Sequence, residues 1–313
     1  MPAMQSSPPQ YLPVIAHGTI LGGLSCVPDM DRAIAAYRDT LGLELVASEL
    51  VSSGLAESWG APGIANARMA TFRPRSDAPC WLRLVEQPFD PEFKPTTTFG
   101  WAAFELTVQD VWQWPDKLPP DQFEIVGPPR HLDNFEPTFI PMQVLGTGRE
   151  MIYLNEVLRD PPDAKLPRAN CPVDKIFICV LASPDRLATI AYYADRLGMD
   201  RGPEYTLAYS MINKAFGLKP DTKTTISMIH RGPEPVLEID DYPAAATARR
   251  TQAGLLPQGN AIVTLAVRDL DGCSVDWLKP PEARSCAPYF GARTATFRGL
   301  AGELTELVEL AAD

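Results

Sequence analysis

The stretch VPDMDRAIAAYRDTLG at residues 27–42 recurs in altered form as SPDRLATIAYYADRLG at residues 183–198. Their shared residues lie 156 positions apart, as Pro28 and Pro184 do (184 − 28 = 156). Self-similarity at a fixed spacing is the sequence signature of a repeated structural unit. The chain is therefore predicted to contain the same unit at least twice.

Each copy carries the signals of a strand that turns into a helix. The apolar runs ILGGLSCV (20–27) and KIFICVLA (175–182) predict buried strands. Asp29 and Asp185 then occupy the place of a helix N-cap, and apolar residues follow at helical spacing. A glycine after each helical pattern occupies the place where a helix ends.

The repeat extends beyond these helices. WLRLVEQP, ending at residue 88, matches VLEIDDYP, ending at 243; GWAAFELTVQD from 100 matches GNAIVTLAVRD from 259; and REMIYLNEV from 149 matches GELTELVEL from 302. Strand patterns follow each helix, and a second, more divergent series begins with the strands near residues 100 and 259. The sequence thus predicts an α+β protein of four β-α-β-β-β modules, two in each half.

A proline-rich segment, VLRDPPDAKLPRANCP at residues 157–172, lies between the halves. It has no hydrophobic periodicity and is therefore predicted to be a linker. We expect an N-terminal domain at residues 1–160 and a C-terminal domain at residues 161–313. The sequence leaves open whether modules pair within each half or across the two halves.

Composition narrows the class of function. The 32 prolines among 313 residues indicate many short elements joined by turns. The formal net charge of −11 disfavours nucleic acid as a partner, and no run of 18 apolar residues predicts a membrane span. The first 18 residues lack a signal-peptide pattern, and the six cysteines are scattered. We expect a cytoplasmic protein, a monomer or homodimer, that binds a small molecule.

The repeated helix stretch and the terminal GELTELVEL resemble the vicinal oxygen chelate superfamily, which includes glyoxalases, bleomycin-resistance proteins and extradiol dioxygenases. The resemblance covers nearly the whole chain at the level of modules. It implies two glyoxalase-like domains whose curled, mainly antiparallel sheets enclose clefts for a small molecule. It also implies a metal bound by histidines of first strands and glutamates of last strands.

The expected metal ligands are largely absent from this sequence. The first-strand positions hold no histidine, and the last-strand positions hold two glutamates. The eight positions are, in order, Gly22, Ala103, Ile178 and Ile262, then Arg83, Tyr153, Glu238 and Glu306. We therefore expect no cofactor and no metal site.

The remaining polar residues suggest acid/base chemistry. Glu238 and Glu306 are candidate catalytic residues, expected to face each other across the C-terminal cleft if the family pairing holds. Two carboxylates in one apolar pocket cannot both ionise freely, so one is expected to have a raised pKa. Asp240 lies on the same strand face as Glu238, and His230 precedes them, so both are candidate substrate-binding residues.

Arg83 and Tyr153 occupy the equivalent positions in the N-terminal half. An arginine facing a cleft can bind a substrate carboxylate, and a tyrosine can donate to an oxyanion. The alternative is that Arg83 pairs with a neighbouring acid and fills an inactive cleft.

Three functions remain open. The first is a metal-independent lyase or isomerase acting on an oxygenated, partly apolar metabolite, a class that includes aromatic metabolites. The second is a protein that binds and sequesters a small molecule without chemistry. The third is a metal-dependent dioxygenase or glyoxalase with relocated ligands. Close carboxylates favour the first function, and an aromatic cleft without shifted acids favours the second.

Overall fold

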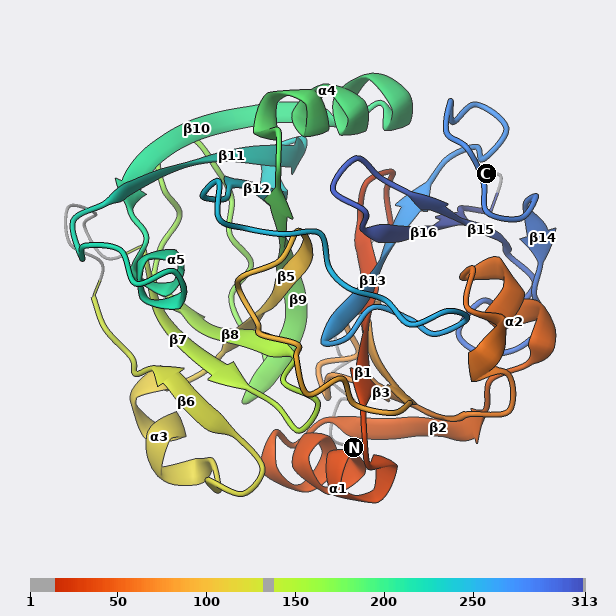
Figure 1. Cartoon of the computed structure of the whole chain (residues 1–313), viewed down its shortest axis with the longest axis horizontal. Coiled ribbons are helices and arrows are strands. Elements are labelled where there is room, and N and C mark those ends of the chain that lie inside the picture. Colours follow the sequence, from red (N-terminus) through yellow and green to blue (C-terminus); the bar gives the residue numbers. More distant parts are fainter. Residues whose placement is uncertain (1–14, 132–137, 312–313) are drawn as a thin grey trace, which may run out of the picture.

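Two eight-stranded sheets form the body of the protein in the computed structural model, which describes residues 15–131 and 138–311 (Figure 1). Sheet 1 has the strand order β14-β15-β16-β13-β1-β4-β3-β2, and sheet 2 has the order β10-β11-β12-β9-β5-β8-β7-β6. Each is mixed, with mostly antiparallel pairs. The expected α+β architecture of repeated strand-rich modules is confirmed.

The strands of sheet 1 come from the two ends of the chain. They are β1 (Ile20–Val27), β2 (Glu44–Leu50), β3 (Arg68–Arg73), β4 (Trp81–Glu86), β13 (Asn260–Val267), β14 (Glu282–Ala283), β15 (Arg293–Arg298) and β16 (Leu304–Glu309).

The strands of sheet 2 come from the middle of the chain. They are β5 (Gly100–Val108), β6 (Glu124–Gly127), β7 (Phe139–Leu145), β8 (Met151–Val157), β9 (Val173–Ser183), β10 (Asp200–Ala208), β11 (Lys223–Arg231) and β12 (Glu234–Asp241).

The helices are short. They are α1 (Met30–Ile34), continued by a π-helix (Ala35–Thr40), α2 (Ser53–Ser58), a 3-10 turn (Pro62–Ile64), a second 3-10 turn (Val111–Gln113), α3 (Trp114–Lys117), α4 (Arg186–Leu197) and α5 (Ser210–Ala215). Asp29 and Asp185 cap α1 and α4 by accepting from the backbone three residues on, and Gly42 and Gly198 have positive φ, as the repeat predicts.

Neither sheet belongs to one half of the chain. β1 pairs with β13, so the first module shares sheet 1 with the fourth. β5 pairs with β9, so the second module shares sheet 2 with the third. The segment between β8 and β9 is the expected linker, but the expected domains at 1–160 and 161–313 are not the units that share a sheet. The modules thus pair across the halves, which the sequence left open.

Two sequence expectations need qualification. The fourth module has no helix between β13 and β14, where Gly272, Pro280 and Pro281 interrupt the chain. Residues 1–14, on which the expected absence of a signal peptide mostly depends, lie outside the described residues. Among the residues described, no helix has the length and apolar character needed to cross a membrane.

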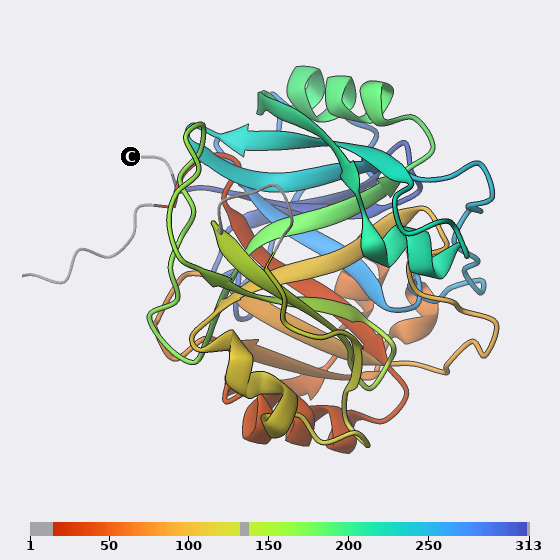
Figure 2. The same ribbon diagram turned by 90° about the vertical axis from the view of Figure 1, so that its left-hand side faces the viewer.

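The main hydrophobic core lies between the sheets and contains residues of both, among them Phe72, Phe104 and Leu237. Two smaller clusters lie on the opposite faces, one on each sheet. We call these opposite faces, which carry the two smaller clusters, the inner faces. Figure 1 shows that the strands of each sheet follow a curved surface. Figure 2 shows α1 and α4 at opposite ends of the molecule, whereas α2 and α5 lie along one side.

The sheets approach each other closely where β1 crosses β5. A Cβ atom added to Gly23 would lie 2.5 Å from the Phe104 ring. Gly23→Ala should therefore lower the free energy of unfolding by about 1–3 kcal/mol, the usual range for overpacking, as measured by urea titration.

Gly54 provides the control for this substitution. A Cβ there would have its nearest neighbour at 3.8 Å, and the residue lies in α2. Gly54→Ala should be neutral or stabilise by about 0.5–1 kcal/mol. If Gly23→Ala were as harmless as Gly54→Ala, the close approach of β1 and β5 would be wrong.

Two buried tyrosine–glutamate pairs connect the sheets. The Tyr37 hydroxyl, on the helix that follows β1, donates to Glu150 before β8 at 2.8 Å. The Tyr193 hydroxyl, on α4, donates to Glu303 before β16 at 3.0 Å. Each pair thus joins a helix that follows a strand of one sheet to the residue that directly precedes a strand of the other sheet. Burial, as the main cause, raises the pKa of each glutamate to about 7.

Candidate functional site

Three carboxyl groups gather on the inner face of sheet 2. Glu238 and Asp240 lie two residues apart on β12, so strand alternation places both side chains on this face. Their side chains are hydrogen-bonded to each other. Glu105 of β5 is the third, and it accepts from the Asn155 amide of β8 at 2.5 Å. All three side chains are carried by strands of sheet 2.

Two tyrosines extend the hydrogen-bond network of this carboxyl cluster. The Tyr209 hydroxyl, just before α5, donates to Glu238 Oε1 at 3.0 Å. The Tyr153 hydroxyl of β8 lies 3.2 Å from that of Tyr209. Tyr209 is half-buried, and Glu238 is 9% exposed. Glu238 is therefore the carboxylate at the outer end of the cluster.

Burial separates the acidities of these groups. It raises the pKa of Glu238 to about 6, while hydrogen bonds from Tyr209 and Asp240 limit the rise. Burial, and then the charge of Glu238, raise the pKa of Asp240 and of Glu105 well above the usual range. Glu238 is thus the carboxyl group of the cluster that ionises near neutral pH, and its two neighbours hold their protons more tightly than an exposed carboxyl group does. This is the arrangement of a proton donor and a proton acceptor.

A second polar cluster lies on the inner face of sheet 1. Glu306 of β16 accepts from the Trp59 indole at 2.8 Å, the Tyr289 hydroxyl at 2.7 Å and the Thr264 hydroxyl at 2.9 Å. Glu306 is only 1% exposed. Both of its oxygens are therefore occupied by protein donors in a sealed environment.

Arg83 of β4 belongs to the same cluster. Its Nη1 donates to the Tyr289 hydroxyl at 2.7 Å, so the tyrosine lies between Arg83 and Glu306. The rings of Trp59, Trp81 and Tyr289 lie 5.7, 5.7 and 4.7 Å from the guanidinium carbon. Aromatic faces stabilise a buried cation at this range.

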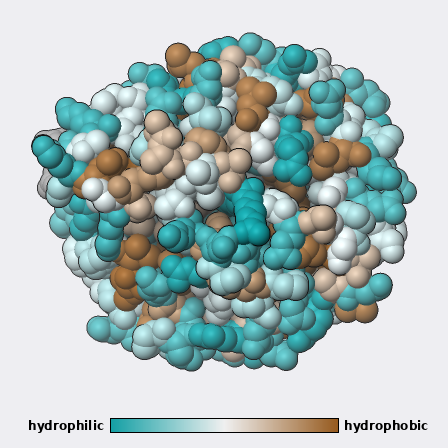
Figure 3. Space-filling view, in the orientation of Figure 1, coloured by the Kyte–Doolittle hydropathy of each residue, from teal (hydrophilic) through white to brown (hydrophobic). Residues whose placement is uncertain are grey.

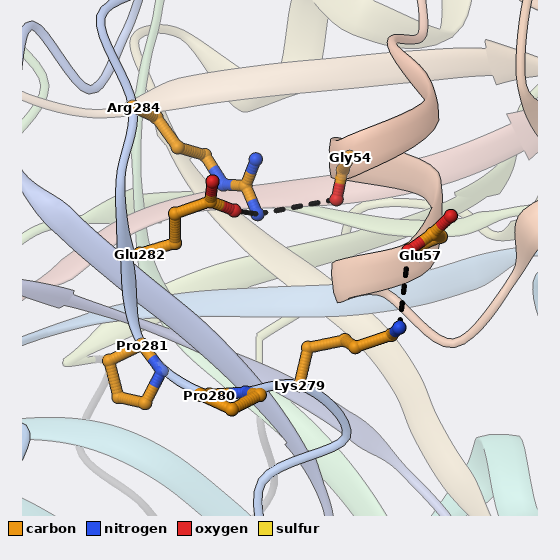
Figure 4. Close-up of a pocket in the computed structure, with 7 residues that line it drawn as sticks. All are labelled: Gly54, Glu57, Lys279, Pro280, Pro281, Glu282 and Arg284. Carbon is orange, nitrogen blue, oxygen red and sulfur yellow. Dashed lines mark hydrogen bonds and ion pairs between the residues drawn. The ribbon is translucent and has the colours of Figure 1, made fainter.

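A pocket of about 300 Å³ lies at the open side of sheet 1, between α2 and residues 279–284 (Figure 4). Lys279 forms an ion pair with Glu57 at 3.1 Å, and Arg284 donates to the Gly54 carbonyl at 3.3 Å. Figure 3 shows this side of the molecule, where polar residues predominate and apolar residues occur in small separate groups.

The predicted site residues thus fall into two groups. Glu238, Asp240 and Tyr153 meet on sheet 2, whereas Arg83 and Glu306 meet on sheet 1. The expectation that Glu238 and Glu306 face each other across one cleft is wrong, because the modules that carry them belong to different sheets. The individual roles predicted for these residues remain predictions.

His230 lies apart from the carboxyl cluster. It lies opposite Asp200 in the register of strands β10 and β11. The charges that act on its imidazole are those of Asp163 and Asp200. Burial is the largest effect and lowers its pKa. A direct contribution of His230 to the carboxyl cluster is therefore not supported.

Sequence reasoning missed several members of both clusters. Glu105 had a detectable signal, because a lone charge within the apolar strand GWAAFELTV must be paired or functional. Tyr209, Asn155, Trp59 and Tyr289 had none, since they come from ordinary positions in helices, strands and loops.

Comparisons with known proteins agree with this architecture. Residues 19–138 match the family described as Glyoxalase/Bleomycin resistance protein/Dioxygenase superfamily. The structure resembles glyoxalase I from Zea mays, with a TM-score of 0.61 and 16% identity over 93% of this chain and 92% of that one. The chain has the vicinal oxygen chelate fold. No curated protein matches its sequence significantly.

A second solved structure with the vicinal oxygen chelate fold is similar over most of its length. It is a putative dioxygenase from Bacillus subtilis subsp. subtilis str. 168, with a TM-score of 0.59 and 12% identity over 95% of this chain and 86% of that one. At these identities the similarity establishes the fold of the chain and leaves its reaction to be argued from its own residues.

The residues at the expected metal positions of this fold do not fit a divalent cation. On sheet 1 the Trp81 ring lies where a Cβ of Gly22 would point, and Arg83 brings a positive charge. On sheet 2 the carboxyl oxygens accept from Asn155 and Tyr209. Within residues 15–131 and 138–311, no three His, Cys, Asp or Glu side chains are arranged to hold a metal ion.

Proposed function

We propose that this protein is a small-molecule enzyme that transfers protons without a metal ion, as an isomerase or lyase, at the inner face of sheet 2. The observation that carries the proposal is the pair formed by Glu238 and Asp240, hydrogen-bonded carboxyl groups whose acidities differ. The vicinal oxygen chelate fold supports a small oxygenated substrate, since relatives with this fold include a glyoxalase.

The residues divide the chemistry between them. Glu238, ionised above about pH 6, accepts a proton from a carbon next to a substrate carbonyl. The Tyr209 hydroxyl, released from Glu238 when the latter is protonated, donates to the developing oxyanion. The proton on Glu238 then returns to a neighbouring atom, which isomerises the substrate, or a leaving group departs.

The alternative is sequestration without chemistry. An aromatic inner face suits that function as well, and Tyr153, Tyr205, Tyr209 and Tyr242 all contribute to the sheet 2 cluster. Binding alone, however, does not require several buried carboxyl groups of raised pKa, which lower stability near neutral pH. The third alternative, a metal-dependent reaction, requires ligands that the described residues do not bring together.

Hydrogen–deuterium exchange of a ketone tests the proposal. The protein, freed of metal with EDTA, is incubated in D₂O with α-hydroxyacetophenone, and the α-proton signal is followed by NMR. We expect the signal to disappear faster than with buffer alone. Saturable binding without exchange would support sequestration, and exchange that requires an added divalent metal would support the third alternative. Either result would overturn the proposal.

A further inference from the structure

A pocket of about 460 Å³ lies away from the strands of both sheets. Besides Arg149, which precedes β8, and Ala215 at the end of α5, it is lined by residues of the connector between β4 and β5. The connector residues are Phe89, Pro91, Phe93, Lys94, Pro95 and Thr97. Small-molecule sites usually measure about 300–1,000 Å³, so this pocket has room for a ligand. Since no strand residue lines it, it is separate from the inner faces.

Hydrogen bonds to a second connector, the one between β12 and β13, hold the wall of this pocket. Both connectors cross the middle of the molecule (Figure 1). The Gln258 amide donates to the Pro88 carbonyl at 2.9 Å, and the Phe99 backbone donates to the Thr247 carbonyl at 2.9 Å. The first connector is thus fixed near both of its ends. A wall fixed in this way costs little ordering when a ligand binds.

Arg249 of the second connector brings a positive charge to this wall. Its guanidinium carbon lies 5.5 Å from the centre of the Phe93 ring. The guanidinium donates only to neutral acceptors, which are the Thr98 hydroxyl and the carbonyls of Gln258, Asn260 and Trp101. Burial lowers its pKa to about 10, and no carboxylate in the described part of the chain pairs with it. The charge of Arg249 is therefore uncompensated.

Two further cations line the pocket directly. Lys94 is exposed, and none of the described residues forms an ion pair with it. Arg149 has one such contact, an exposed pair with Glu124 at 3.2 Å, and exposed pairs contribute little. The acids of the connector are already engaged, since Asp90 accepts from the Glu92 backbone and Glu92 has its own ion pair. In a chain of net charge −11, this pocket therefore favours an anion.

The remaining surface of the pocket is aromatic and rigid. Phe89 and Phe93 are half-buried, and two prolines lie between and beside them. The Phe93 ring lies against Gly259, where an added Cβ would be 2.9 Å from the ring. Gly259 thus provides the space that the ring occupies. Aromatic rings held in this way are suited to packing against a second flat ring.

We propose that this pocket binds the phosphate monoester of a molecule with a flat ring. The phosphate lies between Lys94 and Arg149, because a dianion satisfies two separate cations and both residue types bind phosphate. The ring packs against Phe89 and Phe93. An aryl phosphate and a nucleoside monophosphate share this chemistry. The site has no residue in common with the carboxyl cluster of sheet 2, so the two proposals fail independently.

Calorimetric titration with phenyl phosphate and with AMP tests the site. We expect saturable binding of at least one of them, and the one that binds more tightly identifies the kind of ring. Inorganic phosphate, which lacks the ring, and benzoate, which has a single negative charge, should each bind at least about tenfold more weakly. The proposal is wrong if neither ester binds at millimolar concentration, or if inorganic phosphate or benzoate binds equally well.

Two variants locate the bound ester. Lys94→Gln removes an exposed charge without an ion pair, so it should fold normally and bind the ester at least about tenfold more weakly. Phe93→Leu keeps an apolar side chain but loses the ring, and it should weaken binding about fivefold. Unchanged affinity in Lys94→Gln would refute the site, and unchanged affinity in Phe93→Leu would refute the position of the ring.

Two matched controls distinguish this pocket from the other regions of the molecule. Lys279→Gln removes the same charge at the pocket beside α2, and Glu238→Gln alters the carboxyl cluster of sheet 2. Both variants should bind the ester as the unaltered protein does. A loss in Lys279→Gln equal to that in Lys94→Gln would place the ester beside α2, and an equal loss in Glu238→Gln would place it on sheet 2. Either result would overturn the proposal.

Discussion

Glu238→Gln is expected to reduce the rate of proton exchange by about 10²–10⁴-fold, the usual contribution of a positioned general base. The amide has the shape of the carboxyl group but cannot accept the proton. The same NMR assay of deuterium exchange measures the loss. Because Asp240 and Tyr209 remain, the variant should still bind the ketone, so the effect should appear in kcat rather than in KM.

The pH dependence of the rate provides an independent check. The ionised form of Glu238 is the active one, so the rate should rise as pH increases through about 6. The residual rate of Glu238→Gln should lack this rise. Glu234→Gln is the matched control, because Glu234 lies on the same strand but pairs with Arg231. A wild-type rate that falls through this pH range would exclude Glu238 as the base.

Glu303→Gln is expected to remove a large part of the pH dependence of stability. The folded state raises the pKa of Glu303 from 4.5 to about 7, mainly through burial. The stabilisation by its protonated form is therefore complete below about pH 4 and is lost as pH rises through 7. The shift corresponds to about 3 kcal/mol. Urea titrations between about pH 4 and about pH 8 measure it.

The amide at this position can imitate the protonated acid. Its oxygen can accept from the Ala301 backbone, as Glu303 Oε2 does, while its NH₂ donates to the Tyr193 hydroxyl, which is 2.9 Å from Thr305 Oγ1. Glu150→Gln should have the same effect at the other tyrosine–glutamate pair. Glu124→Gln, at an exposed ion pair with Arg149, should leave the pH dependence unchanged. A steep fall in stability that persists in Glu303→Gln would contradict the assigned role.

The sequence was sufficient for the module architecture because the decisive signals are local. A cap such as Asp29, a terminating glycine such as Gly42 and apolar periodicity each depend on a few neighbouring residues, and the duplication repeats all of them. The pairing of strands β1 and β13 depends instead on contacts between residues more than 200 positions apart. No local pattern specifies such a partner.

The same distinction explains the outcome for the candidate site. Strand alternation correctly placed Glu238 and Asp240 on one face, because that relationship spans two residues. The expected meeting of Glu238 with Glu306 required the pairing of modules, which the sequence did not determine. Tyr209 and Tyr289 reach their carboxylates from connecting segments, whose paths over the sheets depend on tertiary packing.

The pairing of modules across the halves has a historical consequence. If each half descends from one ancestral chain, two copies of that chain would have exchanged modules and formed two identical inner faces, each shared by both copies. Fusion into one gene freed the faces from this two-fold symmetry. Arg83 and Glu238 occupy equivalent positions of the repeat, as do Tyr153 and Glu306. One symmetric pair of sites thus diverged into a face that combines Arg83 with Glu306 on sheet 1 and an acidic face on sheet 2.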